Sequence, residues 1–240
     1  MRYGAAGFCS RPFMDWRLWR HQIEGLRGLL DTVVADVTRG QTVTEIAAAV
    51  LEGLPARFSL AGFSFGSQVA LEMVRLSKER VDRLALLSAT RGGLPPCVAV
   101  AIRQAVERLE HGEFDQYLEA AYPAYFAESS NDDPRIRRCF LDMAHAIGRG
   151  AGLRQMRALL DIRAPFGSLA EIRCPTLILG GRYDRRTTPA EHAALAAEIP
   201  GADLVIVDRA AHFAPLEQPE AVTDALRRWL IAPSSPVPSK

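Results

Sequence analysis

The sequence predicts an α/β fold with a mostly parallel central sheet, helices on both of its faces and a helical insertion. Short apolar runs typical of buried strands alternate with longer amphipathic runs typical of helices, before residue 91 and again after residue 172. Near-continuous apolar strands are typical of parallel sheets, because both faces of such a sheet are covered. The 240 residues, 48% of them apolar, are enough for one large domain of this kind.

Four apolar runs in the first part of the chain have the length and composition of strands. A helix is predicted over Ser67–Leu76, where apolar residues recur three and four positions apart. Thr42 and Glu45 form a capping box, which predicts a second helix over Ile46–Leu54. The predicted strands are Gly4–Cys9, Thr32–Val37, Arg57–Phe63 and Val81–Ser88.

The same alternation returns after residue 172. The first helix expected there starts with a capping box of Thr188 and Glu191, with Pro189 at the first helical position. The predicted strands of this part are Pro175–Gly180 and Asp203–Asp208, and the last predicted helix is Pro219–Ile231.

The stretch between Arg91 and Arg173 breaks the alternation, since it has amphipathic helical patterns and no convincing strand. Its helical segments, RQAVERLEHGEFDQYLEAAYPAYF and RIRRCFLDMAHAIGRG, flank the polar SSNDDP. We expect it to form a cap over the ends of the strands. The predicted organisation is a first core part over 1–91, a helical cap insertion over 92–171, a second core part over 172–231 and a disordered tail over 232–240.

Charge balance and cysteine usage argue against several classes of function. The chain has 29 Lys and Arg against 28 Asp and Glu, whereas nucleic acids and anionic membranes favour a concentrated basic excess. No apolar run approaches the ~20 residues that cross a bilayer, and no signal-like apolar segment stands near the start. The 4 cysteines form no C-x-x-C pair and accompany no histidine cluster, so no metal site is expected. We expect a cytoplasmic protein that binds neither nucleic acid nor membrane.

The sharpest local signal is Gly62-Phe63-Ser64-Phe65-Gly66, at the junction of a predicted strand and a predicted helix. A serine at such a tight turn is held in a strained backbone conformation with its hydroxyl above the sheet, and the glycines let the turn close. The first amides of the following helix point into the same space and favour negative charge there. The motif predicts a nucleophile at Ser64.

A serine nucleophile needs a base, which is in turn oriented by a carboxylate. His212 follows the end of a predicted strand, and Asp184 follows another in the same way. Loops at this edge are where the sites of parallel α/β proteins assemble, and the order Ser64, Asp184, His212 is that of a nucleophile elbow. Asp208 and Asp161 remain rival carboxylates. The other histidines fit helix surfaces or helix ends: His21, His111, His145 and His192.

Three segments, GFSFGSQVALEM, PTLILGGRYDRRTTP and DRAAHFAPLEQPEAVTDALRRWL, closely resemble the α/β-hydrolase superfamily. The resemblance is to small bacterial carboxylesterases, pimeloyl-ester-type esterases and enol-lactonases, and DWRLWRHQIEGL resembles the helix after their oxyanion loop. It is good over 16–91 and 172–231, and between these the chain matches a family cap only in length and character. The resemblance implies Ser64 as nucleophile, His212 as general base and then acid, and Asp184 as its orienting partner, without a cofactor.

The resemblance also implies an oxyanion hole, to which Phe65 contributes its backbone N–H. The chain departs from the family at the second donor, because no His-Gly or Pro-Gly follows the first predicted strand. If Ser10-Arg11 takes the place of that dipeptide, the next residue is Pro12, which has no N–H. A shift of one residue then makes Phe13 the donor. We therefore expect Phe65 and Phe13 to form the hole.

Aromatic residues beside the elbow and in the insertion are the candidates for substrate binding. They are Phe63, Tyr125 and Phe126, although aromatic residues at helical spacing pack in a core more often than they line a pocket. Three arginines beside the predicted catalytic loops can bind a substrate carboxylate, but solvated surface arginines are the more frequent case: Arg91, Arg185 and Arg186.

We predict a serine hydrolase that cleaves a carboxylic ester or lactone of small to medium size through an acyl-enzyme on Ser64. Two alternatives stay open. One is a C–C hydrolase or lyase of the same fold. The other is a protein that binds a small ligand without turnover, which the departure at the oxyanion loop favours. Neither the substrate nor the oligomeric state follows from the sequence.

Overall fold

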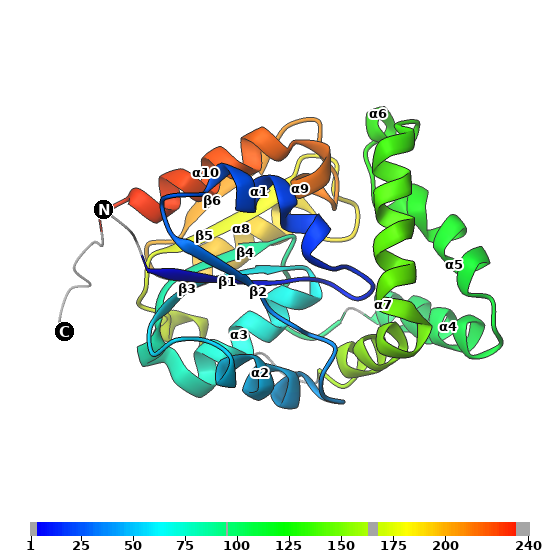
Figure 1. Cartoon of the computed structure of the whole chain (residues 1–240), viewed down its shortest axis with the longest axis horizontal. Helices are drawn as coiled ribbons and strands as arrows, with labels where there is room; N and C mark the ends of the chain where they lie inside the picture. The colour runs from blue at the N-terminus through cyan, green and yellow to red at the C-terminus, as the bar shows by residue number, and fades with distance from the viewer. Residues whose placement is uncertain (1–3, 95, 163–167, 234–240) are drawn as a thin grey trace.

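Six parallel strands form the central sheet of the computed structural model, which describes residues 4–94, 96–162 and 168–233 (Figure 1). Parallel pairing puts the carboxyl ends of the strands at one edge of the sheet. This architecture confirms the predicted α/β fold class. The strands lie in the order β2 (Asp31–Val34), β1 (Ala5–Cys9), β3 (Phe58–Phe63), β4 (Val81–Leu87), β5 (Thr176–Gly181) and β6 (Asp203–Val207).

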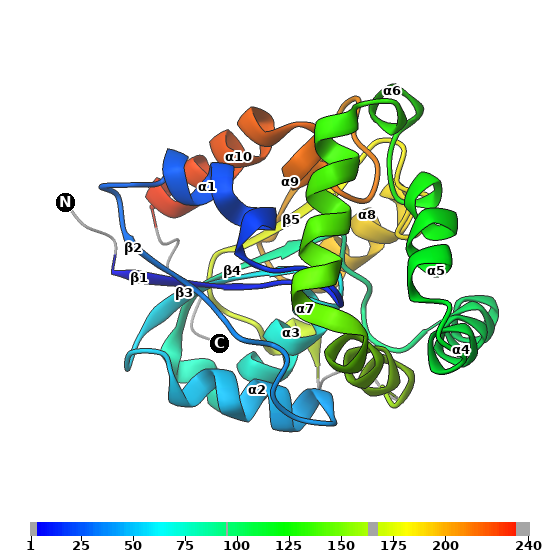
Figure 2. The ribbon, with the colours of Figure 1, turned by 45° about the vertical axis from the view of Figure 1, so that its right-hand side comes forward.

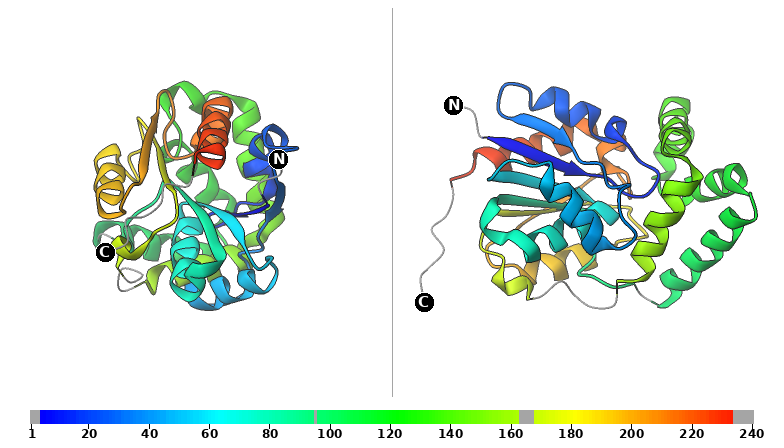
Figure 3. Two further views of the ribbon diagram at one scale, coloured as in Figure 1. Left: turned by 90° about the vertical axis from the view of Figure 1, so that its left-hand side faces the viewer. Right: turned by 60° about the horizontal axis from the view of Figure 1, so that its bottom comes forward.

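Helices cover both faces of the sheet, as the view along it in the left panel of Figure 3 shows. Each face needs such a cover because its apolar side chains have to be shielded from water. One face carries α1 (Arg20–Gly25) and α10 (Pro219–Ile231), the other carries α2 (Val43–Glu52), α3 (Phe65–Ser77) and α8 (Pro189–Glu198), and the short α9 (Ala214–Glu217) precedes α10.

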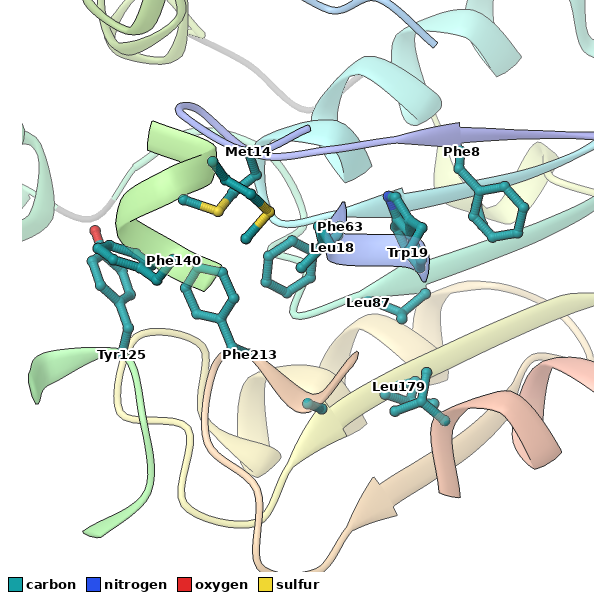
Figure 4. Close-up of a cluster of buried hydrophobic side chains, with 14 of the residues drawn as sticks. Phe8, Met14, Leu18, Trp19, Phe63, Leu87, Tyr125, Phe140, Leu179 and Phe213 are labelled. Carbon is teal, nitrogen blue, oxygen red and sulfur yellow. The ribbon is translucent and has the colours of Figure 1, made fainter. Parts of the chain in front are cut away.

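Alternate residues of a strand point to opposite faces and therefore enter different parts of the core. In β4, Ala85 and Leu87 join the cluster under α10, while Leu84 and Leu86 join the cluster under α2, α3 and α8. All four side chains are fully buried, which explains why the second half of β4, Leu84–Leu87, is continuously apolar. Figure 4 shows part of the first cluster, around Phe63.

Between β4 and β5 the described residues form four α-helices, which lie beyond the carboxyl ends of the strands (Figures 1 and 2). No strand occurs in the described part of this segment. The last of these helices bends at Gly148, whose φ of 79° lies outside the helical region. The four helices are α4 (Pro96–Glu110), α5 (Phe114–Ala121), α6 (Glu128–Asn131) and α7 (Pro134–Leu160).

Hydrogen bonds between near neighbours decide where two of the helices begin. The Thr188 hydroxyl accepts from the amide of Glu191, whose carboxylate accepts from the Thr188 amide, so the predicted capping box of α8 is present. At α2 only half of the predicted box forms. The Thr42 hydroxyl accepts from the Glu45 amide (3.1 Å), but the Glu45 carboxylate accepts from the amide of Gln41 (2.8 Å).

The edge strand β2 is shorter than the predicted strand over Thr32–Val37. Its pairing with β1 ends at Val34, and Asp36 then accepts hydrogen bonds from the amide and hydroxyl of Thr38 (2.9 and 2.6 Å). This turn takes the chain out of the strand direction. Most of the tail predicted over 232–240 lies outside the described residues, which end at 233.

Candidate active site

Ser64 lies at the turn between β3 and α3, with φ 55° and ψ −115°. This conformation is strained for a residue other than glycine and persists only where the surrounding structure holds it. The Ser64 amide donates to the carbonyl of Leu87 (2.8 Å), and the Ser67 hydroxyl donates to the carbonyl of Gly62 (2.7 Å). These bonds hold the turn in the shape of a nucleophile elbow.

The two glycines of the motif are required by close approach of backbone segments. A Cβ atom at Gly62 would lie 2.4 Å from the carbonyl oxygen of Gly66, and a Cβ atom at Gly66 would lie 2.1 Å from that of Cys9. Both distances are far inside van der Waals contact, and the facing atoms belong to packed backbone that has no room to move aside. Gly66 thus allows the end of β1 to lie directly against the elbow.

Three loops at the carboxyl edge of the sheet bring a hydroxyl, an imidazole and a carboxylate together. His212 Nε2 is 3.0 Å from Ser64 Oγ, and His212 Nδ1 is 2.9 Å from Asp184 Oδ2. Ser64 follows β3, Asp184 follows β5 and His212 follows β6. With the ring proton on Nδ1, Nε2 accepts the hydrogen bond from the serine hydroxyl.

The two oxygens of Asp184 have separate partners. Oδ1 accepts from the amides of Arg186 (2.8 Å) and Thr187 (2.9 Å), and Oδ2 faces the ring of His212. Burial by itself would raise the pKa of Asp184, which is 3% exposed, but the histidine and the two amides outweigh burial and lower it. The carboxylate is therefore ionised at neutral pH and fixed in orientation.

The backbone of His212 is held from two sides. Its amide donates to the carbonyl of Tyr125 (3.0 Å), and its carbonyl accepts from the hydroxyl of Ser88 (2.9 Å). Burial lowers the pKa of His212, two nearby guanidinium groups add to the lowering, and Asp184 opposes it without reversing it. The imidazole is therefore neutral at neutral pH, which is the form that accepts a proton.

None of the other candidate side chains forms a hydrogen bond with Ser64, Asp184 or His212 in the described part of the chain. Asp208 pairs with Arg182 at the surface (3.0 Å), and Asp161 follows the end of α7. His192 is fully buried, and neither of its ring nitrogens has a partner among the described residues. The remaining histidines bond to Thr223, to the Glu107 carbonyl and to Asp115, respectively: His21, His111 and His145.

A cavity of about 300 Å³ opens beside Ser64 and His212, between the sheet edge and the helical insertion. Helices α4, α5 and α7 supply most of its apolar wall. Its polar lining includes Arg11, Tyr125 and Arg186. Of the three residues expected to bind substrate, Tyr125 is the one on the cavity wall.

Phe63 and Phe126, which we also expected to contact substrate, lie in the core instead. Phe63 packs against the ring of Trp19, with centroids 6.4 Å apart (Figure 4). It also packs against the ring of His212, with centroids 5.4 Å apart. Phe126 stacks on Phe213, with centroids 4.7 Å apart. Successive side chains of a segment point in different directions, so Tyr125 lines the cavity while its neighbour Phe126 packs in the core. Neighbouring residues therefore do not all reach the cavity.

The amide of Phe13, the expected second oxyanion donor, already has an acceptor. It donates to Gln155 Oε1 on α7 (3.3 Å), and Gln155 Nε2 donates to the carbonyl of Val37 (3.0 Å). The expectation for Phe13 is therefore corrected, although its side chain does line the cavity. By contrast, the amide of Arg11, closer to the end of β1, has no acceptor among the described residues.

Sequence reasoning missed Glu217, which links the helical insertion to the histidine loop. Glu217 is 7% exposed, and its carboxylate accepts from the amides of Ala127 (2.7 Å) and Ala211 (2.8 Å). Burial raises the pKa of Glu217 in spite of these bonds. The two amides come from segments far apart in the chain, so no local pattern predicts that one carboxylate joins them. The only signal in the sequence was an acidic residue within the otherwise uncharged segment FAPLEQP.

Three further findings concern possible metal ligands, the cysteines and membrane-spanning helices. Within the described ranges, no three or more His, Cys, Asp or Glu side chains gather as metal ligands would. Cys9, Cys139 and Cys174 carry free thiols. A search of the same residues for a helix long and apolar enough to cross a membrane finds none.

The fold and the elbow agree with a known family. Residues 6–225 match the model of the alpha/beta hydrolase family, so the chain belongs to that family. It is 28% identical over 240 aligned residues to the putative carbamate hydrolase RutD of Agrobacterium fabrum, covering 89% of this chain and 87% of that protein.

Solved structures of the same fold extend this comparison. A thermophilic esterase from Thermogutta terrifontis has a TM-score of 0.82 and 25% identity, covering 94% of this chain and 89% of that one. The enol-lactonase from Burkholderia xenovorans LB400 has a TM-score of 0.84 and 20% identity, covering 95% and 92%. At 20% identity, the similarity to the enol-lactonase shows a shared fold and nothing more.

Proposed function

We propose that the protein is a serine hydrolase that cleaves the carboxylic ester or lactone bond of a small to medium organic substrate. The observation that carries the proposal is the pair of contacts of His212, 3.0 Å to Ser64 Oγ and 2.9 Å to Asp184 Oδ2, beside a cavity of about 300 Å³. The similarity to a thermophilic esterase supports the choice of bond.

In the proposed mechanism, Ser64 Oγ attacks the carbonyl carbon while His212 Nε2 takes the hydroxyl proton. The carbonyl electron pair moves onto oxygen, and it re-forms the double bond as the C–O bond to the leaving alcohol breaks. The alcohol takes the proton from His212, and the acyl group stays on Ser64. Water then attacks this acyl-enzyme and gives a proton to His212, which returns it to Ser64 as the acid leaves. Asp184 stabilises the imidazolium in both steps.

The negative oxygen of each tetrahedral intermediate needs hydrogen-bond donors. We assign this role to the backbone amides of Phe65 and Arg11, because both residues line the cavity. The Phe65 amide is the first of α3 and has no partner within its helix. The amide of Arg11 then takes the place that we expected for the amide of Phe13. The oxyanion hole therefore has two donors, even though the chain lacks the His-Gly dipeptide of the family.

The rate of hydrolysis is expected to depend on the protonation of His212. The base must be neutral, so kcat/KM rises with pH through its pKa, which lies below the ordinary value of about 6.5. With an uncharged ester, we expect the midpoint of the acid limb below pH 6.5. Arg186→Met removes a positive charge and should move this midpoint upward, whereas Arg185→Met, at an exposed site outside the cavity lining, should not. A wild-type midpoint above pH 7 would contradict this prediction.

A fluorophosphonate probe tests the proposed function, because it reacts with activated serines. The intact mass of the wild-type chain should increase by one adduct, and peptide mapping should place the adduct on Ser64. Ser64→Ala should take up none. If the wild-type chain stays unlabelled while a known serine hydrolase in the same reaction is fully labelled, the proposal is wrong.

A further inference from the structure

Arg11 places a guanidinium in the cavity wall, although very little of the residue reaches solvent. It is 7% exposed and lines the same cavity as Ser64. Its Cζ atom lies 4.0 Å from the centre of the Tyr125 ring and 5.1 Å from that of Phe213. Nη1 is buried and has no hydrogen-bond partner among the described residues. A buried, charged N–H without an acceptor is costly, so this group indicates a site that a ligand completes.

Arg186 brings a second guanidinium to the same ring. Its Cζ atom lies 4.5 Å from the centre of the Tyr125 ring, and Arg186 also lines the cavity. Neither arginine forms an ion pair with an acidic side chain in the described part of the chain, and no described residue of the cavity lining is acidic. Burial alone would raise the pKa of Tyr125, but the two guanidinium charges outweigh burial and lower it. On this side, two guanidinium groups and no carboxylate therefore line the described part of the cavity.

The positive groups lie close to the reacting atoms. The Tyr125 ring, which both arginines contact, is 5.6 Å from the imidazole of His212 between centroids. That imidazole is 3.0 Å from Ser64 Oγ. An anion held by the arginines is thus only a few atoms from a carbonyl carbon under attack by Ser64. Much of the remaining wall is apolar, as at Val98, Ile102 and Met156, and suits a hydrocarbon portion.

We propose that the cavity selects esters or lactones that carry a carboxylate a few atoms from the scissile carbonyl, with Arg11 and Arg186 binding that carboxylate. The planar guanidinium matches the two oxygens of a carboxylate, and Arg11 offers an N–H that the described residues leave unused. The apolar remainder of the substrate lies against α4 and α7. This inference rests on the proposed function and specifies its substrate class.

Two matched pairs of esters test the inference. Monomethyl glutarate against dimethyl glutarate places the charge on the acyl side, and 4-acetoxybutanoate against its methyl ester places it on the alcohol side. In at least one pair we expect kcat/KM of the anion to exceed that of the neutral ester about tenfold to a hundredfold, the usual worth of a charge-assisted hydrogen bond. If the neutral ester is hydrolysed as well as the anion in both pairs, this inference is overturned while the proposed function stands.

Variants locate the preference on the two arginines. Arg11→Met and Arg186→Met keep an unbranched side chain of similar bulk and remove the charge, and each should reduce the ratio of anion to neutral kcat/KM about tenfold, chiefly through KM of the anion. The ratio is taken within one variant, so a general loss of activity cancels. Arg185→Met, at an exposed neighbour outside the lining, should keep the wild-type ratio. An unchanged ratio in both cavity variants, or an equal fall in Arg185→Met, argues against the assignment.

Binding is measured separately from chemistry with the chain carrying Ser64→Ala. Monomethyl glutarate should raise its melting temperature more than dimethyl glutarate does, and the added change Arg11→Met should remove the difference. Selective stabilisation together with a failed fluorophosphonate label would refute the proposed function but keep the anion site. A normal label with neither selective stabilisation nor anion preference would refute the anion site alone.

Discussion

The variant Ser64→Ala is expected to lower kcat for a good ester substrate by about five to six orders of magnitude, because no acyl-enzyme can form. KM should change little, since the hydroxyl contributes to chemistry far more than to binding. Among the described residues the Ser64 hydroxyl bonds to His212 and caps no helix, so the melting temperature should stay close to that of the wild type. Steady-state hydrolysis of short-chain p-nitrophenyl esters and lactones measures the effect.

A matched control is Ser77→Ala, because Ser77 ends the same helix at its far terminus, away from the cavity. It should keep wild-type activity. If Ser64→Ala retained more than a few per cent of the wild-type rate, nucleophilic attack by this serine would be refuted.

Pre-steady-state kinetics also distinguish ester hydrolysis from the alternative of a lyase of the same fold. An ester hydrolase releases a burst of alcohol before the acyl-enzyme is hydrolysed, whereas a lyase that acts by proton transfer alone shows no burst.

The variant Asp184→Asn is expected to lower kcat by about three to four orders of magnitude, as the same change does in a serine protease. Asp184 Oδ1 accepts from two backbone amides, so an asparagine would keep its oxygen there and turn its NH₂ group towards His212 Nδ1. The histidine would then carry its proton on Nε2 and donate to Ser64 instead of accepting from it. KM of the ester should change much less than kcat in the same steady-state assay.

Asp208→Asn is the control for this prediction, since Asp208 follows the neighbouring strand β6 and pairs with Arg182 at the surface. Exposed ion pairs contribute little, so activity and stability should both be nearly unchanged. If kcat fell less than tenfold in Asp184→Asn, or fell by a similar factor in both variants, Asp184 would not be the carboxylate that orients His212.

Features encoded by near neighbours in the chain were predictable from the sequence. The last helix, Pro219–Ile231, has the predicted bounds, and the capping box at Thr188 is formed. The turn at Ser64 was also predictable, because a strand, two glycines and a helix start lie within a few residues. Periodicities of 2 and 3.6 residues and short-range hydrogen bonds carry this information.

Contacts between segments that are distant in the chain were harder to predict from the sequence. Strand ends identified Asp184 and His212 as candidates, but position alone left Asp208 as a rival until the 2.9 Å contact between His212 and Asp184 distinguished them. Phe63 and Tyr125 were equal candidates for the cavity wall, and only the second lies on it. The hydrogen bond that occupies the Phe13 amide comes from α7, 142 positions along the chain.

The amino-acid sequence by itself therefore predicted the parallel α/β architecture, the elbow at Ser64 and the candidates for the triad, because each is marked by a local pattern: the alternation of strands and helices, a turn between two glycines, and polar residues just after strands. Only the tertiary structure decided which aromatic rings reach the cavity, which backbone amides remain available to an oxyanion, and that Arg11 is buried beside Tyr125 without an acidic partner among the described residues. These properties depend on how the insertion packs over the ends of the strands. Such packing joins segments that are far apart in the chain, so no local sequence pattern predicts it.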